Sequence, residues 1–440
     1  MVSRLRKSAA GFIVTALVVF VVVQILLTTG TLNNFWRGII FWGAAITMVT
    51  LGLNLIYGFN GQFSLGQYGF YAIGAYGAAD VTWRWTNGRD PSGLVVVIFG
   101  CLLALGLYIL LARFLRGFNR VTVMTQFTFY LGATIVAFWI AVQFLVPVLG
   151  PVTVTLLEAF PAALTRQVVF FAALVGGAAL AGIASFLFGI PVLELGSDYF
   201  GIATLGFTII VKVLLDNTDT ILPFPEMKGA RGMIGIPQWT TWPWVFFSLL
   251  MVVIVMRNLL HSSIGRTIVS VREDERAAEL VGINVVNAKI FAFVIGSVFA
   301  GLAGGIRAHD LAFLHPQSFN FVQSFNPLII VVLGGLGSIT GTVVTGFGWI
   351  LLLEGVLRLA LPQGFETWRF VIYPLVLLLM MLLRPEGLFG GYEIPYLRQK
   401  LPAPFKPRVA DADAAAQPTT HAPVPAVSHG GADSSHEVAA

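Results

Sequence analysis

The sequence predicts an all-α, polytopic integral membrane protein with about 10–12 crossings. Of its 440 residues, 57% are hydrophobic and 11% are charged, whereas about a quarter of the residues of a soluble domain are charged. Apolar runs of about 20 residues, long enough to cross a hydrocarbon core, recur between short polar breaks. The runs are continuous and lack the alternation of barrel strands, so helices are expected.

The first expected span covers residues 11–27 and follows Arg4, Arg6 and Lys7. No small-residue cleavage site comes after it, so we interpret it as a retained span preceded by a cytoplasmic N-terminus, residues 1–10. Further apolar runs follow along the chain in a regular succession. They lie at about 38–57, 63–81, 94–112, 127–149, 167–189, 199–215, 243–260, 289–306, 325–357 and 370–383.

The positive residues orient these spans. Counting from a cytoplasmic N-terminus places the cluster around Arg116 and the segment 257–289 inside, in agreement with the positive-inside rule. Basic residues after Arg384 favour a cytoplasmic C-terminus, so an odd number of crossings must fit between residues 322 and 384. We therefore predict broken or half-spanning helices, with one break inside the bundle. Its glycines are Gly334, Gly335, Gly337 and Gly341.

Three regions are predicted: the N-terminus 1–10, a transmembrane body 11–390 that includes a cytoplasmic loop at 261–288, and a tail at 391–440. The tail is rich in Ala, Pro, Ser and Thr without apolar periodicity, so it is expected to be disordered and cytoplasmic. The single cysteine, Cys101, excludes a disulfide framework, and the histidines lack ligand spacing. We expect no metal and no cofactor bound by this chain.

The loop after residue 261 has a helical pattern from Ile268 onwards. Ile268, Val271, Ala278 and Val281 are expected on one face, and Gly282 is expected to end the helix. On the other face, i,i+3 pairs are expected between Arg272 and Glu275 and between Arg276 and Glu279. An amphipathic helix with small residues can dock into a groove of a partner. A solvated loop helix fits the same pattern equally well.

A glycine-rich segment follows the second run. Its polar residues suggest a broken helix with inward-facing amides and hydroxyls, the way transporters present polar groups to a substrate. From Asn60, a helix would place polar residues at i+4, i+7 and i+11 on one face. Plain helix packing is the alternative for each residue taken singly. The residues expected to border a path are Asn54, Asn60, Ser64, Gln67 and Tyr71.

Several chemistries are excluded by missing patterns. No glycine loop ends in Gly-Lys-Ser/Thr, so no ATP site is encoded, and no serine elbow or zinc-protease motif indicates an enzyme. Charged residues within the expected spans are few, with Lys212, Asp216 and Glu354 as examples. This scarcity argues against a carrier driven by protons or sodium, although an ion-coupled transporter, a channel and a membrane scaffold stay open as alternatives.

Four further segments and the loop carry a family resemblance. The loop resembles the coupling-helix motif of ABC importer permeases, and the whole set is similar to permeases of branched-chain amino acid importers, in the order that family shows. The resemblance is weak at 115–165 and after 395, and Arg276 stands where many such permeases carry glutamate. The segments are Gly52–Gln67, Ser197–Phe207, Arg276–Asn284, Gly334–Gly341 and Arg384–Gly390.

The resemblance implies a permease subunit that carries branched-chain or other aliphatic amino acids across a bacterial inner membrane; urea and short amides are alternatives. It further implies a second, similar permease subunit, two cytoplasmic ATPase subunits that use ATP, and an extracytoplasmic binding protein. No nucleic acid is expected. The loop 264–284 would contact the ATPases. The residues implied in that contact are Arg272, Glu273, Asp274, Arg276, Ala277, Ala278 and Gly282.

Overall fold

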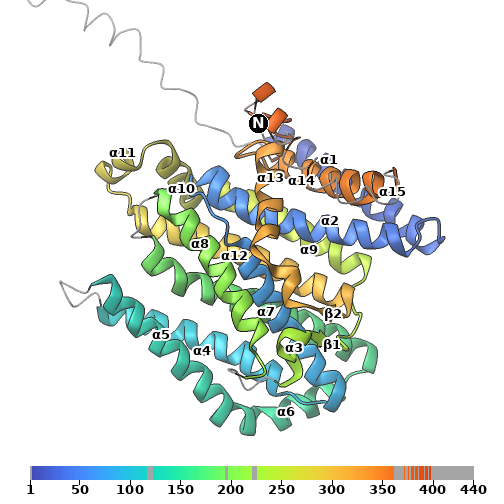
Figure 1. The fold of residues 1–440 in the computed structure, drawn as a ribbon, viewed down its shortest axis with the longest axis vertical. Coiled ribbons are helices and arrows are strands. Elements are labelled where there is room, and N and C mark those ends of the chain that lie inside the picture. The colour runs from blue at the N-terminus through green and yellow to red at the C-terminus, as the bar shows by residue number, and fades with distance from the viewer. Residues whose placement is uncertain are drawn as a thin grey trace, which may run out of the picture. The chain divides into compact units, whose positions relative to one another are not determined.

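The computed structural model describes residues 2–115, 122–193, 197–220 and 225–360, together with scattered positions between 371 and 397. Helices make up nearly all of this part of the chain (Figure 1). The all-α, polytopic prediction is therefore confirmed. The predicted run at 370–383 lies largely outside the described residues, and the tail from residue 398 lies wholly outside them.

The α-helices, in chain order, are α1 (Val2–Thr28), α2 (Asn34–Leu53), α3 (Gln67–Gly88), α4 (Ser92–Leu115), α5 (Val123–Ile140), α6 (Val146–Glu158), α7 (Ala162–Val192), α8 (Ser197–Asp216), α9 (Trp242–His261), α10 (Ser263–Glu273), α11 (Glu275–Leu280), α12 (Val285–Leu311), α13 (Phe325–Gly334), α14 (Ile339–Ile350) and α15 (Arg358–Ala360). The π-helical turns are η1 (Asn54–Phe59), η2 (Ala141–Leu145) and η7 (Leu351–Leu357). The 3-10 turns are η3 (Pro225–Met227), η4 (Gly229–Arg231), η5 (Pro316–Phe319) and η6 (Phe321–Ser324). Strands β1 (Met233–Ile234) and β2 (Phe313–Leu314) pair antiparallel, Met233 opposite Leu314.

Nine helical segments within the described residues are long and apolar enough to cross a membrane. Several are continuous through π-helical turns, as where α2 runs into η1 and α5 runs through η2 into α6. Helix α3 is also long, and it is more polar, with most of its residues buried. It lies among the spans in the place predicted at 63–81, although its first turn begins at Gln67.

Small residues allow the central helices α2, α3 and α12 to pack closely. A side chain on Gly74 would collide with the backbone of Gly301, and one on Gly52 would collide with Gly296. Lipid tails are as apolar as leucine, so helices associate in a membrane through such close van der Waals packing. The glycines therefore fix α2, α3 and α12 against one another in the core.

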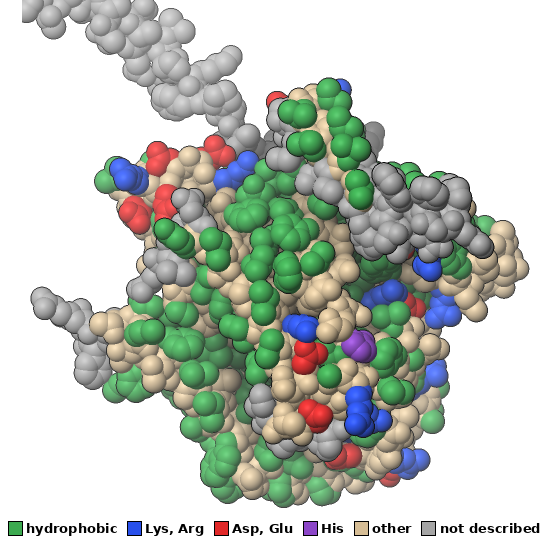
Figure 2. Space-filling view, in the orientation of Figure 1, with side chains coloured by type: hydrophobic (Ala, Val, Ile, Leu, Met, Phe, Trp, Pro, Cys, Tyr) green, Lys and Arg blue, Asp and Glu red, His purple; other side chains and the backbone are tan. Residues whose placement is uncertain are grey.

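The peripheral helices carry the lipid-facing surface. The most hydrophobic 18-residue window of the segment Ala10–Thr28 in α1 has a mean hydropathy of 2.8, and none of that window is buried. By contrast, 89% of the corresponding window in Asn34–Phe59 is buried. Figure 2 shows hydrophobic side chains across the middle of the face in view, with charged side chains gathered over α10 and α11 and again near β1 and β2.

Two helix breaks interrupt the core. After η1 the chain continues without regular structure through residues 60–66 before α3 begins, and four residues separate the end of α13 at Gly334 from the start of α14 at Ile339. Gly335 and Gly337 have φ values of +106° and +81°, which side chains disfavour, and Ser338 caps α14 through the N–H of Gly341. Helices α13 and α14 thus form a hairpin, in keeping with the predicted break at 334–341.

Candidate functional site

Asn54, the first residue of η1, contacts the helix break between α13 and α14. Its side-chain nitrogen donates to the carbonyl of Ser338 at 2.9 Å and to Oγ1 of Thr342 at 2.8 Å, and its oxygen accepts the N–H of Gly337 at 2.9 Å. The side chain is fully buried. Polar backbone at membrane depth needs such partners, because lipid supplies none. The structure therefore places Asn54 as a brace of the turn between α13 and α14, residues 335–338, which we call the glycine turn. The sequence had suggested that Asn54 borders a substrate path.

Arg272 of α10 contacts the end of η1 and lies next to the glycine turn. Its Nη1 donates to the carbonyl of Gly58, at the end of η1. A Cβ at Gly337 would lie 3.0 Å from that nitrogen, and a Cβ at Gly61 would lie 3.3 Å from Cγ of the same side chain. One side chain of the loop therefore contacts both breaks.

Glu393 holds the glycine turn from a third direction. Its carboxylate accepts the N–H of Ile339, the N–H of Thr340 at 3.3 Å and the hydroxyl of Thr340 at 2.5 Å, at the N-terminus of α14. A negative charge is stabilised there by the helix dipole. Leu397 is buried as well. The predicted start of the tail at residue 391 therefore lies too early, because these residues pack against the body.

The loop between α9 and α12 contains two helices. The prediction of a single helix from Ile268 is therefore wrong. Helix α10 begins earlier, at Ser263, and ends at Glu273. Asp274 is extended (φ −156°) and its side chain accepts the N–H of Ala277 at 3.0 Å, so it starts α11. The expected i,i+3 pairing of Arg272 with Glu275 is also wrong, because Glu275 pairs with Lys289 at 2.5 Å.

The buried face of this loop differs from the predicted one. Ile268, Val271 and Ala278 are buried, as expected, but Val281 follows the end of α11 and is 77% exposed. Ala278 packs inside the chain with Val271 and the first turn of α12. The remaining residues implied in partner contact are exposed: Arg272, Glu273, Asp274, Arg276, Ala277 and Gly282. Leu280, which sequence reasoning did not select, is 89% exposed.

The predicted path residues from Asn60 to Tyr71 are buried, but they do not form one helical face. Gly61 has a φ of +79°, so Asn60 and Ser64 lie before α3, and only Gln67 and Tyr71 share a helix. Asn60 donates to Oε1 of Gln62 at 2.9 Å. The backbone of Leu65 donates to the hydroxyl of Thr204 at 2.9 Å and accepts from Thr208 at 3.3 Å. The two threonines of α8 thereby satisfy extended backbone inside the bundle.

Two cavities lie at opposite ends of this region. A cavity of about 180 Å³ is lined by Asn60, Arg272 and Lys289, next to α10 and α11. A second cavity, of about 320 Å³, is lined by Tyr71 and Arg307. Lys289 and Arg307 are eighteen residues apart on α12, which is about 27 Å at 1.5 Å per residue. The predicted path residues therefore extend between two separate cavities.

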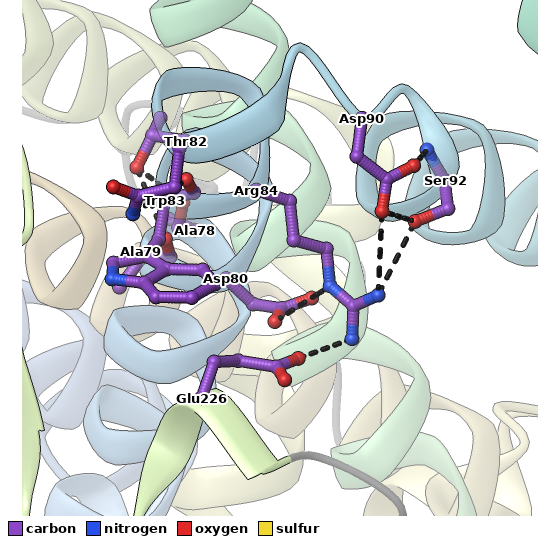
Figure 3. A network of polar contacts seen from close by, with 10 residues as sticks. Ala78, Ala79, Asp80, Thr82, Trp83, Arg84, Asp90, Ser92 and Glu226 are labelled. Carbon is purple, nitrogen blue, oxygen red and sulfur yellow. Dashed lines mark hydrogen bonds and ion pairs between the residues drawn. The ribbon is translucent and has the colours of Figure 1, made fainter.

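A charged cluster lies at the far end of α3 from α10. Arg84 donates through Nε to both carboxylate oxygens of Asp80, at 3.0 and 3.1 Å, and through Nη2 to Glu226 of η3 (Figure 3). Its Nη1 donates to Ser92 at 3.2 Å and lies 3.8 Å from Asp90. The side chains of Asp80 and Glu226 are 9% and 6% exposed. Arg84 thus ties α3, the start of α4 and η3 together.

Comparison with known proteins finds the same family that the sequence motifs resemble. The family model described as "Branched-chain amino acid transport system / permease component" matches residues 35–152 and 128–383. This match includes residues 115–165, where the motifs resemble the family least. No solved structure shows significant similarity to the chain.

Individual relatives match over shorter stretches. The chain is 34% identical to the "High-affinity branched-chain amino acid transport system permease protein LivM" of Escherichia coli over 238 residues, 48% of this chain and 55% of the relative. It is 29% identical to the corresponding LivH of Salmonella typhimurium over 44% of this chain and 64% of the relative. It is 28% identical to BraD of Pseudomonas aeruginosa over 40% of this chain and 56% of the relative. Each match spans less than two thirds of the relative.

Proposed function

The chain belongs to the branched-chain amino acid transport permease family, and we propose that it is the membrane subunit of an ATP-driven importer of branched-chain or other aliphatic amino acids. The printed names of the relatives support this substrate class and do not favour urea or short amides. The chain itself would bind no ATP, because ATP would be used by partner subunits.

The contact of Arg272 with both helix breaks carries this proposal. Helix α10 lies in the loop expected to meet the ATPase subunits, and Arg272 connects it to Gly58 and Gly337. A displacement of α10 would therefore move η1 and the turn between α13 and α14 together. Because Asn54 also bridges these two segments, they would respond as one unit. ATP binding could favour one arrangement of this unit through differential contacts.

The docking surface would be the exposed end of α11. Leu280, the last residue of α11, and Val281, which follows it, are 89% and 77% exposed, although the buried face of α11 packs on α12. Two neighbouring exposed apolar side chains at the tip of a charged loop suit the core of a protein interface, which is more apolar than its rim and depleted of charged residues. We propose that they insert into an ATPase subunit, with Ala277 and Gly282 allowing close approach.

The complete importer would contain further subunits. The resemblance to both LivM and LivH supports a second, similar permease subunit beside this chain. Two cytoplasmic ATPase subunits and an extracytoplasmic binding protein complete the proposal. The chain would lie in the bacterial inner membrane with both termini and the α10–α11 loop in the cytoplasm, as the distribution of basic residues favours.

Purification from the native membrane tests the proposal. An affinity-tagged chain should retain an ATPase subunit and a second permease subunit, and Leu280→Asp should release the ATPase while the permease pair stays intact. Ile234→Asp is the matched control, since Ile234 is 54% exposed on β1 and lies away from the loop. Absence of any ATPase subunit from the tagged wild-type chain would contradict the proposal.

A further inference from the structure

The cavity at the C-terminal end of α12 has a distinctive lining. It measures about 320 Å³ and lies beside Trp42, Tyr68, Tyr71, Arg307 and Phe319. Ligand pockets in proteins cover roughly 300–1,000 Å³, so this cavity suits a small solute. Aromatic rings and one guanidinium in the same small space indicate a ligand with both an apolar part and an anionic group.

We propose that this cavity binds a zwitterionic amino acid with an aliphatic side chain, and that Arg307 receives its carboxylate. This inference rests on the proposed import function and adds the place and the contacts of the substrate. The aromatic rings would hold the aliphatic side chain.

Arg307 is suited to a carboxylate. The guanidinium has five N–H donors in a fixed fork that matches a carboxylate with two parallel hydrogen bonds. Among the described residues its Nη1 pairs with Asp310 at 2.5 Å, and the guanidinium carbon lies 5.6 Å from the centre of the Trp42 ring. This anchoring at one nitrogen holds the group at the cavity wall. The other nitrogens provide donors for a ligand.

The aromatic wall is continuous. The ring centres of Tyr68 and Tyr71 are 5.3 Å apart, and those of Tyr71 and Phe319 are 5.6 Å apart. Ring edges and faces at these distances form an apolar surface that gains free energy by covering an aliphatic side chain. Because Phe319 comes from η5 and the tyrosines come from α3, the site is assembled by segments far apart in the sequence.

Gln67 provides the next polar group beyond the cavity. Its side chain is 1% exposed, and neither Nε2 nor Oε1 has a partner among the described residues. Gln67 lies one turn before Tyr71 on α3. Phe70, on the same turn of α3, contacts Phe293 of α12, and the two ring centres are 5.3 Å apart. Phe293 lies between Lys289 and Arg307 on α12, so Gln67 lies between the levels of the two cavities. A buried amide without a partner is costly, which favours a role in contacting substrate once the region opens.

Protection of a cysteine from labelling tests the site. Cys101 is the single cysteine, so Cys101→Ser gives a clean background for Ser318→Cys, at an exposed residue of the cavity lining, and for Asn87→Cys, at the exposed end of α3. In the assembled transporter, L-leucine at about ten times its half-saturating concentration should slow maleimide labelling at 318 by about tenfold, since only the unoccupied fraction reacts. Labelling at 87 should not change.

Two comparisons address the role of Arg307. Leucinamide, which lacks the carboxylate, should need at least about a tenfold higher concentration than leucine for the same protection of position 318, because a charge-assisted contact is lost. Arg307→Lys keeps the charge beside Asp310 but loses the planar fork, and it should weaken protection by leucine to a similar extent. Equal protection by leucine and leucinamide would contradict the assignment of Arg307.

The outcomes separate this inference from the proposed function. Unchanged labelling at 318 in the presence of leucine, or no labelling there at all, would overturn the site even where wild-type uptake is normal. Protection at 318 by leucine in a transporter that shows no ATP-driven uptake would support the site and count against the proposed function.

Discussion

The side chain of Asn54 on η1 and the backbone of Gly337 in the turn between α13 and α14 are 283 residues apart in the sequence, and the Asn54 oxygen accepts the Gly337 N–H at 2.9 Å. The same amide donates to Ser338 and Thr342 on the other side of the turn. Arg272 then links η1 and this turn to α10.

Asn54→Leu should destabilise the protein strongly. The substitution leaves the N–H of Gly337 and the carbonyl of Ser338 without their partner, and a buried unsatisfied polar group costs about 1–3 kcal/mol. We expect a lower thermal midpoint in detergent. The exposed Asn87, which bonds only the carbonyl of Trp83 within its own helix, supplies Asn87→Leu as a control with little effect. Equal thermal midpoints for the two variants would contradict the bracing role of Asn54.

Gly341→Ala and Gly348→Ala should differ although both glycines belong to α14. A side chain at Gly341 would meet the backbone of Gly334, which the α13–α14 hairpin holds in contact, whereas no described residue lies within 4 Å of a Cβ at Gly348. Overpacking costs about 1–3 kcal/mol, while alanine in an open helical position stabilises by roughly 0.5–1 kcal/mol. Thermal unfolding of the two purified variants measures the difference. A Gly341→Ala protein as stable as the wild type would contradict the close backbone contact between Gly341 and Gly334.

Arg272→Gln should reduce the amount of substrate imported for each ATP hydrolysed. The shorter neutral side chain would lose the contact with Gly58, so motion of α10 would reach the helix breaks less effectively. The ATPase subunits should still co-purify, because the exposed end of α11 is unchanged. Arg266→Gln, an exposed residue of the same helix, is the control and should keep the wild-type ratio. A wild-type ratio for Arg272→Gln would remove Arg272 from the coupling route.

Arg84→Gln should be far more harmful than Arg89→Gln. Removing the Arg84 charge leaves the buried carboxylates of Asp80 and Glu226 uncompensated, and breaking a buried pair in this way costs about 3–5 kcal/mol. The pair of Arg89 with Glu158 is exposed on both sides, and such a pair contributes about 0–1 kcal/mol. The yield of folded protein and its thermal midpoint provide the measurement. Similar losses for both variants would argue against a special role for the Arg84 cluster.

The positions of the spans and the break were predictable from the sequence because hydropathy and glycine act locally. A continuous apolar run must form a helix in lipid, and the density of glycine at 334–341 marks a turn that other residues resist. The bracing role of Asn54 was not predictable, because its partners Gly337 and Thr342 come from a distant segment. Nothing near Asn54 in the sequence indicates that contact.

Local capping explains the error in the loop. The apolar period around Ile268 continues through Ala278, so a single helix was expected, but the side chain of Asp274 bonds the N–H of Ala277 and starts a new helix there. The sequence Asp274–Ala277 contains this capping signal, but Asp274 stands between two glutamates and was therefore counted with the charged face of one helix. Similarly, Gly61 breaks the helical face predicted from Asn60.

The cavity beside Arg307 was not predicted, because its lining combines α3, α12 and the 3-10 turn η5. In the sequence, Arg307 directly follows the apolar run at 289–306, and at the end of an expected span a basic residue needs no special explanation. An unpaired buried amide such as Gln67 is also visible only once the surrounding chain is in place. Its polarity among glycines was the one signal available from the sequence.

Uptake by proteoliposomes that contain the assembled transporter tests the central claim most directly. With the binding protein outside and ATP supplied to the ATPase subunits, labelled leucine should accumulate, and it should not accumulate without ATP or with a proton or sodium gradient in its place. Leu280→Asp should abolish this uptake, whereas Ile234→Asp should preserve it. Accumulation driven by an ion gradient in the absence of ATP would contradict the account.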